Sequence, residues 1–136
     1  MHRGLTAVTA QSLRSFQGGR GNALLEGKKI PIYGDGQQIR EWIHVWDFAS
    51  AVDAVLHQGK VGEIYNLGTR CRTTNLEVAH EILKLLGKDE SFIEHVQDRA
   101  GHDRRYAVNS DKLRKQLGWK PEYDFERALA ETVHWY

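Results

Sequence analysis

The sequence is poor in cysteine, in excess charge of either sign and in long apolar runs. Its 136 residues contain one cysteine, Cys71, which cannot form an internal disulfide and so agrees with a reducing compartment. Nineteen Lys and Arg residues against 18 Asp and Glu residues give a net charge of +1, which argues against a nucleic-acid module. No apolar run is long enough to span a bilayer, and the N-terminus lacks a signal-peptide core. We therefore expect a cytoplasmic protein without nucleic-acid or membrane partners.

The seven histidines do not form a metal-binding pattern. His80-Glu81 is followed by Lys84 where a zinc-protease helix would carry a second histidine, and Cys71 has no thiol partner. A Cys71 nucleophile with a distant histidine is an alternative that no local pattern supports. The sequence thus predicts no metal site.

Hydrophobic patterning predicts short strands that alternate with helices. Strands are expected at residues 30–33, 39–45, 63–67 and about 92–96. Because proline cannot donate to a sheet ladder, Pro31 marks its strand as an edge strand, and a turn at residues 34–36 follows. Helices are expected after four capping residues, Asp47, Thr74, Ser110 and Asp124. Residues 1–21 are expected to be an irregular arm, and residues 22–26 the end of a helix that stops at Gly27. The predicted fold class is mixed α/β.

Residues 98–106 hold three arginines, one histidine and two aspartates around Gly101. A loop can present guanidinium groups that match the oxygens of phosphate or carboxylate, so an anionic ligand is predicted here. The alternative is a solvated loop whose charges neutralise one another. Arg40 stands inside an apolar strand and is either salt-bridged or directed into a ligand cleft. Asn75 lies in the first turn of a helix, where it meets a polar ligand or supports the cap.

Several motifs together resemble the C-terminal part of dTDP-glucose 4,6-dehydratase, a member of the extended short-chain dehydrogenase/reductase superfamily. The resemblance covers residues 22–136, and its most specific element is Gly-His-Asp-Arg-Arg-Tyr at residues 101–106. The other motifs also occur in related nucleotide-sugar epimerases. They are Pro-Ile-Tyr-Gly-Asp-Gly at 31–36, Arg-Glu-Trp at 40–42, Tyr-Asn-Leu-Gly at 65–68, Thr-Asn at 74–75 and Leu-Gly-Trp at 117–119.

The resemblance implies a Rossmann domain that holds NAD and a smaller C-terminal domain that holds the dTDP moiety of the sugar nucleotide. Matched motifs then place Pro31, Ile32 and Tyr33 against the nucleoside. Arg40 and Arg99 would meet the diphosphate, and Asn75 would supply a polar contact. The loop formed by Asp98, Arg99, Ala100, Gly101 and His102 would close on the nucleotide.

The sequence also departs from the family. It has no glycine-rich dinucleotide fingerprint, no Tyr-x-x-x-Lys pair and no Thr-Asp-Glu group, and Ala100 replaces the usual proline, which makes the loop less rigid. We therefore expect residues 1–21 to be an unmatched arm and residues 22–136 a nucleotide-sugar-binding domain whose Rossmann half is absent. Such a chain would bind a dTDP-sugar, would not bind NAD or turn over alone, and would need another chain to supply the missing half. The alternatives are a non-catalytic remnant that folds or self-associates without ligand, and a piece of a nucleotide-sugar epimerase.

Overall fold

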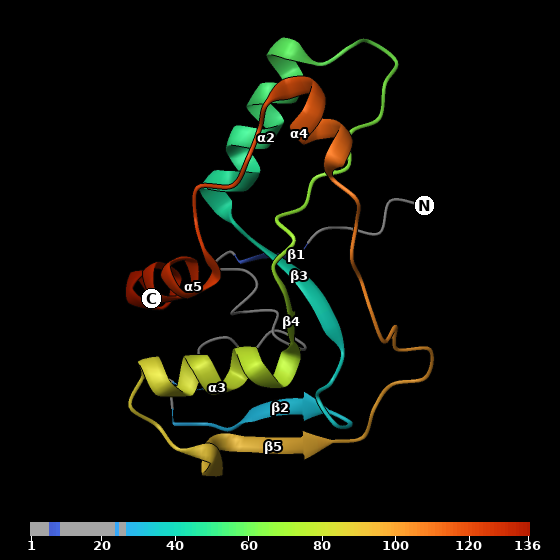
Figure 1. The fold of residues 1–136 in the computed structure, drawn as a ribbon. Helices are drawn as coiled ribbons and strands as arrows, with labels where there is room; N and C mark the ends of the chain where they lie inside the picture. The colour runs from blue at the N-terminus through green and yellow to red at the C-terminus, as the bar shows by residue number, and fades with distance from the viewer. Residues whose placement is uncertain (1–5, 9–23, 25–26) are drawn as a thin grey trace.

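The computed structural model describes residues 6–8, 24 and 27–136 of the chain (Figure 1). Its elements, in chain order, are β1 (Thr6–Val8), β2 (Ile30–Tyr33), β3 (Ile39–His44), α2 (Val45–Gln58), β4 (Arg72–Thr74), α3 (Asn75–Leu85), the 3-10 helix η1 (Glu90–Phe92), β5 (Ile93–Val96), α4 (Asp111–Leu117) and α5 (Phe125–Trp135). The predicted mixed α/β class is confirmed.

The strands form two small sheets. One has the order β1-β3-β4, in which β3 pairs parallel with β1 and antiparallel with β4, and the other is the parallel pair β2-β5. In Figure 1, α2 and α4 lie side by side at one end of the molecule, and β2, β5 and α3 lie at the other. Because β3 runs between the two ends, its first residues lie beside the segment that leads from β5 to α4, where Ile39 and Arg105 form an isolated bridge.

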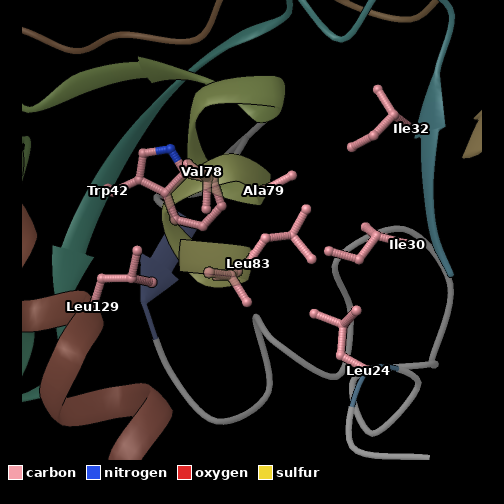
Figure 2. Packing of buried hydrophobic residues seen from close by; sticks show 9 residues of the cluster. Leu24, Ile30, Ile32, Trp42, Val78, Ala79, Leu83 and Leu129 are labelled. Atoms are coloured by element: carbon pink, nitrogen blue, oxygen red, sulfur yellow. The ribbon is translucent and has the colours of Figure 1, made fainter. Parts of the chain in front are cut away.

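The larger hydrophobic core lies between α3, the β2 strand and α5 (Figure 2). Side chains three and four residues apart on α3 face inward, which is the pattern of an amphipathic helix. The buried members of this core are Leu24, Ile30, Ile32, Trp42, Val78, Ala79, Ile82, Leu83 and Leu129. A second cluster joins α2 to α4 through Ile43, Ala51, Leu67, Leu113 and Trp119. The two cores lie on opposite faces of β3, because its neighbouring residues Trp42 and Ile43 belong to different cores.

Two expectations about strands are wrong. Residues 63–67 do not form a strand, because no strand in the described part of the chain lies beside them to share backbone hydrogen bonds. The strand of this region is instead β4, whose Thr74 pairs with Ile39. The arm is not irregular at Thr6–Val8, which form β1 along β3. The rest of residues 1–21, and the expected helix end at 22–26 apart from Leu24, lie outside the described residues.

The four expected helix caps have different outcomes. Thr74 and Glu77 form the predicted capping box, with Glu77 N donating to Thr74 Oγ1 at 3.2 Å, and Asp124 accepts from Arg127 N at 2.8 Å. Asp47 is not the cap of α2, which begins at Val45; its buried carboxylate accepts from the backbone N–H groups of residues 122 and 123. Ser110 occupies the cap position of α4 but donates its hydroxyl to the Gly68 carbonyl.

One side of α2 exposes apolar side chains. Val45, Phe48, Val52 and Leu56 recur at helical spacing and are between 39% and 77% exposed, and we call them the α2 apolar face. The opposite side of the helix packs against α4 through Ala51. Within the described residues, none of the helices combines the length and apolar character that crossing a membrane requires.

Candidate functional site

The turn between β2 and β3 lies against the start of the charged loop. Gly34 and Gly36 have φ of +57° and +71°, as predicted for this turn. A Cβ on Gly36 would approach Ile32 Cγ2 at 2.7 Å and Leu76 Cβ at 2.9 Å, so the close packing of the turn requires glycine there. Gly34 N donates to the Val96 carbonyl at 2.9 Å, which fixes the turn beside the end of β5. Residues 98–102 therefore begin directly next to the turn.

Arg40 is buried at the start of β3 without a carboxylate partner. Its side chain is in a residue that is only 8% exposed, and no Asp or Glu of the described chain lies within ion-pair distance of its guanidinium. Nη1 donates to the Ile39 carbonyl at 2.8 Å, Nη2 lies 3.0 Å from His102 Nε2, and the Tyr106 ring lies 4.9 Å from the guanidinium carbon. Burial lowers the pKa of Arg40; Tyr106 raises it, the positive charge of Arg99 lowers it, and the carboxylate of Asp103 raises it by a smaller amount. Of the two hypotheses for Arg40, the salt bridge is thus not found within residues 6–8, 24 and 27–136.

His102 joins Arg40 to Asp98. Its Nδ1 lies 2.6 Å from Asp98 Oδ1, and its side chain is only 4% exposed. Because a carboxylate can only accept, we assign the proton to Nδ1, which leaves Nε2 to accept from Arg40. The hydrogen bond from His102 lowers the pKa of Asp98, so this carboxylate stays ionised and the bond is lost only as pH falls through that lowered pKa. The Tyr33 ring meets the His102 ring edge-on, with centroids 6.0 Å apart.

The two aspartates of the loop have partners within it, Asp98 with His102 and Asp103 with Tyr106, whereas Arg104 pairs outside it. Arg104 makes a bidentate ion pair with Asp35 of the β2–β3 turn, at 2.9 Å for both bonds. Asp103 accepts from the Tyr106 hydroxyl. Arg99 has no ion pair with any residue that the structure describes, and it is exposed. A free guanidinium therefore remains beside the buried Arg40.

The other predicted binding residues differ in how much of each is accessible to a ligand. Ile32 is fully buried in the core, so any ligand contact would come from its backbone, whereas Pro31 and Tyr33 are partly exposed. Asn75 is 7% exposed, and the capping is done by Thr74 and Glu77 without its side chain. Ala100 and Gly101 are exposed, and Gly101 has a φ of +69°, within a turn closed by His102 N on the Arg99 carbonyl.

Two buried polar side chains at the site were missed by the sequence analysis. Gln38 is 1% exposed and donates Nε2 to both the Tyr33 carbonyl and Asp98 Oδ2. Glu41 is 5% exposed and accepts from two backbone N–H groups, those of Arg70 and Val108. A sequence signal exists for Glu41 alone, which is a charged residue directly after Arg40 in an otherwise apolar strand; Gln38 precedes the strand and carries no such signal.

Other chemistries find no support among the described residues. No group of three or more His, Cys, Asp or Glu side chains in that part of the chain could hold a metal ion. Burial raises the pKa of the Cys71 thiol to about 11, with a smaller contribution from Glu41. The thiol is therefore protonated at neutral pH, which removes the basis for the Cys71 nucleophile.

Comparison with known proteins identifies the family of this chain. The family model for GDP-mannose 4,6 dehydratase matches residues 9–132, a range that includes residues 9–21 of the arm. The dTDP-glucose 4,6-dehydratase of Xanthomonas campestris is 47% identical over 121 residues, which cover 82% of this chain and 34% of the relative.

Solved structures agree with this match. The dTDP-glucose 4,6-dehydratase of Bacillus anthracis, in complex with NAD, is 53% identical with a TM-score of 0.80, and the match covers 85% of this chain and 36% of that one. DesIV, the enzyme of Streptomyces venezuelae solved with NAD and TYD bound, is 42% identical with a TM-score of 0.82 and the same coverage. The chain thus spans about a third of the length of these relatives. It belongs to the GDP-mannose 4,6 dehydratase family of the extended short-chain dehydrogenase/reductase superfamily, and it is similar to the C-terminal part of dTDP-glucose 4,6-dehydratase.

Proposed function

We propose that this chain is the part of a dTDP-glucose 4,6-dehydratase-like protein that binds the dTDP-sugar. The observation that carries the proposal is the buried Arg40 guanidinium, which forms no ion pair with a described residue and lies near Arg99, which forms none there either. A buried cation that lacks a direct ion pair is costly even with the Asp103 carboxylate in the vicinity, and the neighbouring Arg99 adds repulsion. A diphosphate between them would remove both costs and accept charge-assisted hydrogen bonds from each guanidinium.

The nucleoside would lie along the β2–β3 turn in this proposal. Tyr33 offers a partly exposed ring beside His102, and Pro31 is also partly exposed. The exposed residues Ala100 and Gly101 would close over the ligand, while Asp98 and His102 hold the base of the loop. Asn75 would offer its side-chain amide from the first turn of α3.

NAD does not fit the described residues. The relatives of known structure hold NAD, but this chain carries neither the glycine-rich fingerprint nor the Tyr-x-x-x-Lys pair. We therefore propose that the 4,6-dehydratase reaction requires the two thirds of the relatives' length that this chain does not match. No catalytic role is assigned to its own residues.

The first prediction concerns the ligand of the isolated chain. Calorimetric titration with dTDP should give binding at one site, because the diphosphate supplies the charge that Arg40 and Arg99 lack. The same titration with NAD should give none, and dTDP-glucose should yield no 4-keto-6-deoxy sugar. UDP serves as the comparison nucleotide. Tighter binding of UDP than of dTDP would favour the epimerase alternative, and absence of binding to both would favour the remnant.

We further propose that the α2 apolar face is where the remaining two thirds of the fold pack. Val45, Phe48, Val52 and Leu56 expose a continuous apolar stripe on the side of α2 away from α4. The relatives are about three times as long as the matched region, so a large part of their fold must pack against it. Residues 63–67 lie close in sequence to α2 and expose Ile64 without a neighbouring strand in the described chain.

The second prediction tests this surface by complementation. Co-expression of the chain with the N-terminal two thirds of the Xanthomonas campestris relative should give a complex that co-purifies and converts dTDP-glucose. Leu56→Asp should lower the yield of complex at least tenfold, because it places a charge in an apolar interface. Leu85→Asp is the control, since Leu85 is also an exposed leucine, at 44% exposure, but lies on α3. Equal loss with both variants would refute the assignment of the α2 face.

A further inference from the structure

Gln38 is a buried polar residue whose side chain is bonded to the loop that faces Arg40. We propose that Gln38 is a positioning residue for the diphosphate-binding arginine, and that it acts on Arg40 through Asp98 and His102. This inference rests on the proposed dTDP-sugar function, since it assigns a role within the same site. Gln38 has no hydrogen bond to Arg40 among the described contacts, its own side chain is buried, and no motif singles it out in the sequence.

The orientation of the Gln38 amide follows from its partners. Nε2 lies 3.2 Å from the Tyr33 carbonyl oxygen and 3.1 Å from Asp98 Oδ2. Both partners are acceptors, so the amide must present its NH2 group to them. One donor group thus connects the end of β2 to Asp98, which lies 60 positions after Gln38 in the sequence.

From Asp98 the hydrogen bonds continue through His102 to Arg40. With Oδ2 held by Gln38, Oδ1 faces His102 Nδ1 at 2.6 Å, and His102 Nε2 faces Arg40 Nη2 at 3.0 Å. The carboxylate keeps the imidazole proton on Nδ1, and Nε2 can then accept from the guanidinium. In the other tautomer an N–H would face the N–H of Arg40, and the guanidinium would lose this orientation.

The backbone of Gln38 has a separate structural role. Its carbonyl accepts from Asn75 N at 3.1 Å and so ties the turn to α3. A side-chain substitution leaves this bond in place. The effect of the amide on Arg40 can therefore be separated from the packing of the turn.

The experiment compares Gln38→Met with Gln37→Met. Methionine keeps the length of glutamine without its donor, and Gln37 is the exposed neighbour, so the second variant controls for the substitution itself. Two quantities are measured on the purified chain: the affinity for dTDP, and the imidazole 15N shifts of His102, which report its tautomer. Gln38→Met should weaken dTDP binding about tenfold and shift His102 away from the Nδ1–H tautomer, whereas Gln37→Met should change neither.

A second variant, Gln38→Glu, keeps the test decisive if Gln38→Met does not fold. It sets a carboxylate against Asp98, with His102, Arg40 and Arg104 as the other charged or titratable groups nearby. Two ionised carboxylates repel, and one shared proton removes the repulsion. The ratio of its dTDP affinity to that of the parent should therefore fall as pH rises from about 5 to about 8.

The outcomes separate this inference from the proposed function. If the parent chain does not bind dTDP, the proposed function fails, while the His102 tautomer in the unliganded variants still tests the role of Gln38. An unchanged tautomer in Gln38→Met overturns the inference, whether or not affinity falls, because a purely structural role would lower affinity without altering the tautomer. A pH-independent affinity ratio for Gln38→Glu overturns it as well.

Discussion

Replacing Arg40 with Ala is expected to weaken dTDP binding by about 1.5 to 3 kcal/mol, which is roughly a tenfold to hundredfold rise in Kd. The guanidinium is held before any ligand arrives, by the Ile39 carbonyl, by His102 and by the Tyr106 ring. Such preorganisation means that little side-chain entropy is lost when the diphosphate binds. Arg40→Lys should recover only part of the affinity, because an ammonium group cannot donate to His102 and to two phosphate oxygens in the same planar geometry.

Titration of two loop variants with dTDP provides the control. Arg99→Ala should weaken binding to a similar degree, and Arg105→Ala should not, although Arg105 is equally exposed and belongs to the same loop. Thermal melts of each variant show whether the fold is retained. Unchanged affinity for Arg99→Ala would mean that the loop is structural, and the assignment of the diphosphate site would be wrong.

Local sequence signals predicted the fold where local interactions determine it. The capping box at Thr74 and Glu77 involves residues three apart, and the turn at Gly34 and Gly36 depends on backbone conformations that glycine favours. The apolar segment 63–67 satisfies the same pattern rules, yet a strand exists only when a second strand lies beside it. The prediction that Asp47 caps its own helix was wrong for a related reason. Its carboxylate accepts hydrogen bonds from the backbone of Glu122 and Tyr123, which follow it by 75 and 76 positions.

At the candidate site, too, the sequence predicted single residues but not the long-range contacts between them. Arg40 and His102 were found because a charge in an apolar strand and a histidine in an arginine-rich loop are visible in the sequence. Their contact with each other spans 62 positions, and the contact of Gln38 with Asp98 spans 60. No spacing rule connects residues so far apart. The sequence could therefore name the arginine that binds an anion, but not the buried amide that orients it.

The last prediction concerns Glu41, the neighbour of Arg40 in β3. Glu41→Ala is expected to lower the free energy of unfolding by about 3 kcal/mol, because it leaves two partly buried backbone N–H groups without their acceptor. Oε1 accepts from Arg70 N at 2.7 Å and Oε2 accepts from Val108 N at 3.1 Å. Arg70 is the non-glycine residue with positive φ in the described chain, at +70°, so its bond to Glu41 also offsets a strained backbone.

Urea denaturation of three variants would test this account of Glu41. Glu41→Gln keeps the shape but turns one of the two oxygens into an NH2 group that faces an N–H, so it should lose about half as much stability as Glu41→Ala. Glu94→Ala, on the exposed face of β5, is the matched control and should change stability by less than about 0.5 kcal/mol. If Glu41→Ala were as stable as the parent, the two segments around residues 70 and 108 would hold their positions without it. The strand that carries Arg40 would then owe its placement to its pairing with β1 and β4 and to the cores that contain Trp42 and Ile43.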